Sequence, residues 1–141
     1  MPADAARLRR LHRLEKVRAI ARQTAAREAA EAEGTLAQLR ALAERTAQMA
    51  EGYRAKAGPA LAQDLRQMDS FAAGLRGISH ATSGDADRAR SFADRKQQAL
   101  AQAERARSAV EERAEAEARA IAQHRQQLTL GARRSVGTGL E

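Results

Sequence analysis

Residues 100–128 read LAQAERARSAVEERAEAEARAIAQHRQQL, and one set of positions in this stretch recurs at steps of three and four. The set is Leu100, Ala103, Arg107, Val110, Ala114, Glu117, Ile121, His124 and Leu128. This spacing places the side chains on one stripe of a helix, as in a coiled coil. Because three of the nine positions are polar or charged, the stripe buries little apolar area, and we expect the helix to need a packing partner.

A similar stripe is predicted in the first part of the sequence. It passes through Leu39, Leu42, Thr46, Met49 and Tyr53, and it continues backward through Leu11, Leu14, Ala21, Ala25, Ala32 and Thr35. Alanine-rich stripes let helices approach closely but bury little area per residue. We therefore predict a flexible N-terminus at 1–5 and a long helix at 6–57.

Two breaks are predicted between the long helices. Gly58 can end the first helix and Pro59 can begin the next one. A short middle helix is predicted at 59–78, with a stripe at Leu61, Leu65, Met68, Ala72 and Leu75, flanked by Phe71 and Ile78. The Ser, Thr and Gly residues of 77–84 predict a loop at 79–85, after which Asp85 caps a long helix at 86–130. The tail at 131–141 is expected to be disordered.

The fold class that follows is all-α: a long two-helix antiparallel coiled coil with a short intervening helix. Ala, Glu, Lys, Leu and Arg account for 86 of the 141 residues, a composition typical of long helices and coiled coils. A parallel homodimer is the alternative, and the break at Gly58 and Pro59 argues against one continuous rod.

The composition argues against an enzyme. Leu, Ile, Val and Phe together number only 21 of 141 residues, too few for a compact domain with a buried pocket. Cysteine is absent, and His12, His80 and His124 are isolated from other metal-ligating side chains. We predict no catalytic, cofactor or metal site. With no apolar run of the roughly 20 residues that a membrane span needs, we expect a soluble protein.

Basic residues are concentrated at the start of the chain. The formal net charge is +7, and residues 1–22 hold seven Lys and Arg against Asp4 and Glu15. Such a segment could contact an acidic protein, nucleic acid or lipid head groups. Nucleic acid is disfavoured because stacking aromatics are nearly absent and no leucine zipper follows the basic segment.

The arrangement of these segments resembles the FliJ family of flagellar export proteins, related to the YscO proteins of type III secretion. The resemblance is carried by three stretches: LRRLHRLEKVR at 8–18, FAAGLRGI at 71–78 and the Ala/Arg/Glu-rich run at 99–118. It implies a long antiparallel coiled coil, without enzymatic activity, in the cytoplasm at the inner-membrane base of the flagellum. The implied partners are the hexameric export ATPase, the export-gate membrane protein and the escort chaperones of late substrates.

The resemblance also implies which residues make these contacts. The export-gate contact falls on Gln38, Leu42, Met49, Phe71, Leu75 and Ile78. Arg45 stands where the family usually has an aromatic residue, and Thr82 where it usually has a histidine. The ring contact of the family involves the paired helix ends, which directs attention to Arg9, Arg10 and Arg13. For the gate residues, ordinary packing between the two helices is the competing interpretation.

Overall fold

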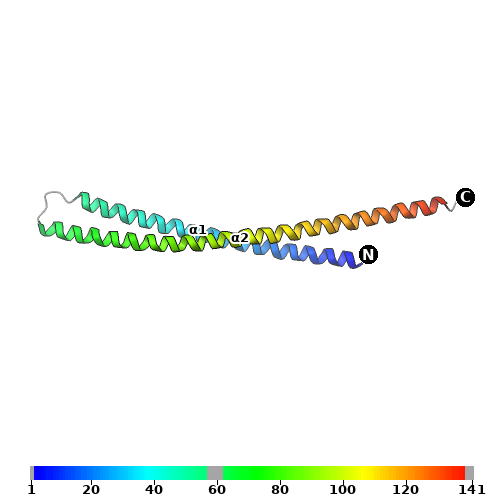
Figure 1. Cartoon of the computed structure of the whole chain (residues 1–141), viewed down its shortest axis with the longest axis horizontal. Coiled ribbons are helices and arrows are strands. Elements are labelled where there is room, and N and C mark those ends of the chain that lie inside the picture. The colour runs from blue at the N-terminus through cyan, green and yellow to red at the C-terminus, as the bar shows by residue number, and fades with distance from the viewer. Residues whose placement is uncertain (1, 57–61, 139–141) are drawn as a thin grey trace. The chain divides into compact units, whose positions relative to one another are not determined.

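The structure, a computed structural model, describes residues 2–56 and 62–138, which form two helices (Figure 1). Helix α1 runs over Pro2–Ala55 and helix α2 over Ala62–Thr138, and the described residues include no strand. The predicted all-α fold of two long helices packed against each other is confirmed. Contacts divide the chain into unit 1, residues 1–25 and 100–141, and unit 2, residues 26–99.

In unit 2 the two helices pack antiparallel. Three contacts join them: Lys96 Nζ to a Glu28 carboxylate oxygen at 3.1 Å, Ser79 Oγ donating to the Ala43 carbonyl at 2.9 Å, and the Tyr53 ring against the Phe71 ring at 4.8 Å between centroids. As the residue number rises along α1, the number of its partner on α2 falls. The hydrogen bond from a short serine side chain to the opposing backbone also shows that the helices approach closely.

The packing interface of unit 2 consists mainly of alanine. Its buried residues are Ala29, Ala32, Leu36, Ala43, Thr46 and Ala50 on α1, and Ala72, Leu75, Thr82, Ala86 and Ala93 on α2. On each helix they follow steps of three and four, with half-buried residues such as Leu39, Ser79 and Ala89 completing the stripe. Small side chains at these positions allow the short distance between the helices, and their combined burial stabilises the pair.

Six of the eleven members of the stripe predicted on the first helix are exposed: Leu14, Ala21, Thr35, Leu42, Met49 and Tyr53. Leu42 and Met49 are each 47% exposed, whereas Ala43 and Ala50 beside them are buried. The physical reason is the register of the interface. It passes through Leu36, whose burial beside Ala32, Ala86 and Ala93 supplies more apolar area than Thr35 could, and the same register places Ala43 and Ala50 in the interface and Leu42 and Met49 at its edge.

Unit 1 is built from α1 up to Ala25 and α2 from Leu100 onward, again antiparallel. Arg7 lies 3.6 Å from Glu117 and Arg22 lies 3.2 Å from Glu104. These ion pairs are partly exposed, so each contributes at most about 1 kcal/mol. The stripe predicted at 100–128 is confirmed from Leu100 to Ile121, where every member is buried or half-buried, while His124 and Leu128 are exposed.

The predicted loop at 79–85 is wrong, and so is the separate middle helix at 59–78. Both stretches, as far as they are described, belong to the continuous helix α2. A Cβ built on Gly77 or Gly84 would meet no atom within 4 Å, and neither glycine has a positive φ. Each glycine costs about 1 kcal/mol of helix stability against alanine. Burial of Leu75, Thr82 and Ala86 along the same turns offsets that cost.

Both ends of the chain are more helical than predicted. Helix α1 begins at Pro2, so residues 2–5 are helical rather than flexible, and α2 continues to Thr138 through most of the predicted tail. A proline is tolerated at the first helical position because its missing N–H has no intrahelical acceptor there. The predicted break at Gly58 and Pro59, with Met1 and residues 139–141, lies outside the described residues.

Candidate functional site

All six residues assigned to the export-gate contact belong to unit 2, but they do not share one environment. Leu42 and Met49 are each 47% exposed, Phe71 is 50% exposed and Ile78 is 55% exposed. Gln38 is also exposed on α1. Leu75 is buried against α1 and belongs to the helix interface. Leu75 therefore fits the competing interpretation as ordinary packing, and Phe71 is partly packed through its contact with Tyr53 of α1, whereas the other four are exposed.

Four exposed apolar residues lie on one side of the unit 2 interface. The interface stripe steps alternately by three and by four residues. Leu42 and Met49 directly precede Ala43 and Ala50 of α1, and Phe71 and Ile78 directly precede Ala72 and Ser79 of α2, all of which begin a step of three. In an antiparallel pair, the residues that precede these positions on the two helices lie along the same edge. We call Leu42, Met49, Phe71 and Ile78 the apolar flank.

The opposite edge of the unit 2 interface is polar. It is formed by the residues that directly follow the interface positions preceding a step of four, and these include Glu33, Arg40, Ala47, Arg76, Ser83 and Arg90. Charged residues commonly occupy both edges of a two-stranded coiled coil, where they keep the pair soluble and in register. The edge that holds the apolar flank also carries Glu28 and Asp85, but the flank itself is an uncharged stretch of it, and an exposed apolar stretch of this kind is typical of an interaction site.

Shallow hollows accompany the apolar flank. One, of about 400 Å³, lies beside Gly74 and is lined by Gln67, Ser70, Phe71, Gly74, Leu75 and Ile78. Another, of about 610 Å³, is lined by Tyr53, Asp64, Gln67, Met68 and Phe71. The edge-to-face contact between Tyr53 and Phe71 separates the two rings by 4.8 Å and fixes the Phe71 ring between these hollows. A partner side chain could enter either hollow without moving the backbone.

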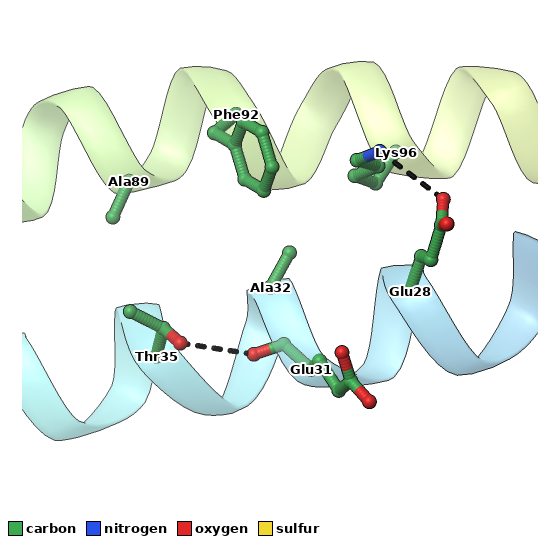
Figure 2. A pocket seen from close by; sticks show the side chains of 7 residues that line it. All are labelled: Glu28, Glu31, Ala32, Thr35, Ala89, Phe92 and Lys96. Atoms are coloured by element: carbon green, nitrogen blue, oxygen red, sulfur yellow. Dashed lines mark hydrogen bonds and ion pairs between the residues drawn. The ribbon is translucent and has the colours of Figure 1, made fainter.

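A third hollow, of about 340 Å³, lies on the same edge farther along α2 (Figure 2). Its lining residues are Glu28, Glu31, Ala32, Thr35, Ala89, Phe92 and Lys96. Phe92 is 46% exposed, and Lys96 Nζ lies 5.3 Å from its ring centroid while bonding Glu28. Sequence reasoning missed Phe92, although it lies at a multiple of seven residues from Phe71 and Ile78.

Arg45 and Thr82, where the resemblance leads us to expect an aromatic residue and a histidine, have different environments. Arg45 is exposed on α1. Thr82 is only 8% exposed and forms part of the helix interface. A contact through position 82 would therefore require the two helices of unit 2 to separate.

The three arginines assigned to the ring contact belong to unit 1. Arg9, Arg10 and Arg13 are all exposed, and the described residues give none of them an ion pair. Charge is also divided unequally between the units. Unit 1 holds 14 Lys and Arg against 8 Asp and Glu, a net +6, and unit 2 holds 11 against 10, a net +1. Unit 1 therefore carries most of the net positive charge of the chain.

Within residues 2–56 and 62–138, no three His, Asp or Glu side chains gather as a metal site would require. His12 Nδ1 lies 3.3 Å from Glu15, one turn along the same helix, which is an ordinary surface pair. In the same ranges, neither helix has a stretch long and apolar enough to cross a membrane.

Comparisons with known proteins gave no match to a family model, to a curated protein or to a solved structure.

Proposed function

We propose that this chain is a non-enzymatic coiled-coil stalk component of a flagellar type III export ATPase complex. In this role it promotes assembly of the hexameric ATPase ring and links the ring to the export-gate membrane protein and to escort chaperones. It would act in the cytoplasm, at the inner-membrane face of the flagellar base. The proposal rests on the resemblance at 8–18, 71–78 and 99–118, together with the antiparallel pairing of two long helices.

The observation that carries the proposal is the apolar flank of unit 2. The resemblance assigns the gate contact to six positions, and four of them form this flank. Each side chain is about half exposed. Burying the exposed half of a large apolar side chain contributes about 1 kcal/mol, so the four together could supply a binding contact of useful strength.

The gate contact is tested by removing two side chains from different helices. Met49→Ser combined with Ile78→Ser should weaken binding to the cytoplasmic part of the export-gate protein about 30-fold, from about 2 kcal/mol of lost burial. Isothermal titration calorimetry measures this. The matched control is Leu128→Ser, because Leu128 is 61% exposed but belongs to unit 1. Equal losses in both variants, or none in the double variant, would contradict the assignment.

The ring contact is tested by charge reversal. Replacing Arg9, Arg10 and Arg13 together with glutamate should weaken association with the export ATPase at least about tenfold, because three exposed cations become anions. The matched control reverses Arg54, Arg66 and Arg90, which are exposed in unit 2 and produce the same change in net charge. Ring assembly is followed in a pull-down. If both triple variants bind equally, the contact does not depend on these three residues.

A basic coiled coil that binds nucleic acid or a membrane surface is the alternative function, and the net +6 of unit 1 favours it. Duplex DNA would be bound by phosphate contacts that release counterions, so affinity would fall steeply as salt rises. A titration of the chain with duplex DNA, and another with anionic lipid vesicles, at several salt concentrations separates this alternative from the export role. Tight binding with a steep salt dependence would favour the alternative.

A further inference from the structure

In unit 2, α2 carries a second stripe beside the interface, which α1 leaves exposed although Tyr53 contacts Phe71 at its edge. It follows the same steps of three and four as the buried stripe, but every member is exposed. The members are Asp64, Gln67, Phe71, Gly74, Ile78, Ala81, Asp85 and Arg88. A helix with two such stripes can pack against two helices at once, and α1 occupies only one of them.

We infer that two copies of this chain associate through this second stripe, with the α2 helices of the two copies antiparallel and crossing at the level of Arg76. The members of the stripe lie at equal distances on either side of that level. Gly74 then faces Ile78 of the second copy, and Phe71 faces Ala81. The remaining facing pairs are Asp64 with Arg88 and Gln67 with Asp85.

Shape complementarity supports this pairing. The hollow of about 400 Å³ beside Gly74 receives the Ile78 side chain of the second copy, and the two-fold symmetry repeats the contact. A Cβ at Gly74 would meet no atom within 4 Å, as at the other described glycines, so the space beside Gly74 is open. Phe71 likewise faces the small Ala81, so that each large side chain of the stripe meets a small one.

Charge complementarity favours a second copy in this orientation. The middle of the stripe, from Gln67 to Ala81, has no charge, and its ends place Asp64 against Arg88. Arg88 already pairs with Asp85 of its own helix, and its five N–H donors can serve both carboxylates. A parallel pair would instead oppose Asp64 to Asp64 and leave Phe71 facing Phe71. Because unit 2 has a net charge of only +1, the two copies of unit 2 repel each other little.

Self-association is measured on the chain alone by sedimentation equilibrium over a range of concentrations. The wild-type mass should rise from 15.3 kDa toward twice that value. Gly74→Arg should hold the mass at the monomer value, because the new side chain fills the hollow, while circular dichroism shows equal or greater helix content. The control Gly34→Arg, at another exposed glycine with open space around it, should associate like the wild type. A monomeric wild type, or association by Gly74→Arg, would overturn the inference.

A charge-swap cycle tests the register. Asp64→Arg should weaken self-association about tenfold, because it faces Arg88 of the second copy, and Arg88→Asp should do the same against Asp64. The double variant restores opposite charges and should regain most of the wild-type association. If it remains as weak as the single variants, Asp64 and Arg88 do not face each other and the antiparallel register is wrong.

This inference does not rest on the proposed function, although it shares Phe71 and Ile78 with the gate contact. A chain that binds the export gate but stays monomeric would overturn self-association and leave the function standing. A chain that associates but does not bind the gate would do the reverse. If both contacts exist, they exclude each other, and excess gate protein should dissociate the pair in the same sedimentation experiment.

Discussion

Ser83→Pro is expected to lower the free energy of unfolding of unit 2 by about 3 kcal/mol or more. Ser83 lies inside helix α2, where proline removes a backbone hydrogen bond and its ring clashes with the preceding turn. Because the Ser83 side chain is exposed, the loss comes from the backbone and not from packing. Urea unfolding followed by circular dichroism measures the change.

The control for this substitution is Ala62→Pro, at the first residue of α2. The N–H of a first helical residue has no intrahelical acceptor, so proline there should cost close to nothing. The two variants thus place the same residue in the same helix with opposite expected results. If Ser83→Pro were as stable as Ala62→Pro, residues 79–85 would form a loop, as their composition suggests, and the continuous helix would be wrong.

Ala93→Leu is expected to destabilise unit 2 by about 1–3 kcal/mol. Ala93 is 0% exposed and packs in a cluster with Ala32, Leu36 and Ala86. The extra methylene and methyl groups have no free volume between helices that approach this closely, so the helices must move apart or the side chain must leave its preferred rotamer. Urea unfolding again measures the change in free energy.

The matched control is Ala37→Leu, because Ala37 is exposed on α1 and leucine is nearly as good a helix former as alanine. Its unfolding free energy should stay close to that of the wild type. If Ala93→Leu were instead more stable than the wild type, unit 2 would contain unfilled space at its interface. The alanines would then not set the distance between the helices.

The stripe at 100–128 could be predicted from the sequence because Leu100, Val110 and Ile121 are the only large aliphatic residues in the first three-quarters of that stretch, and a single register joins them. The stripe at 39–53 could not. There, Leu42 and Met49 competed with the neighbouring alanines Ala43 and Ala50, and size favoured the wrong pair. Hydrophobicity predicts which side chains can be buried, but the register in which the two helices pack decides which of them lie in the interface.

The candidate site, too, could be predicted only in part from the sequence. The resemblance assigned six gate-contact residues, yet only the structure separates Leu75, which packs between the helices, from the exposed Phe71 and Ile78. Phe92 was missed because no matched motif includes it. Its spacing from Ile78 becomes meaningful only once residues 79–85 are known to be helical, since a loop would break the register between them.

The sequence by itself determined that this chain is helical and that its helices must pair, because its charged and alanine-rich composition favours helix and supplies too little apolar bulk for any single helix to be stable alone. It also determined the basic character of residues 1–22. Tertiary structure decided which side of each helix is buried and that residues 79–85 continue α2 as a helix. Alanine fits an interface and a solvent-exposed face almost equally well, so only the register in which α1 and α2 pack selects between its positions.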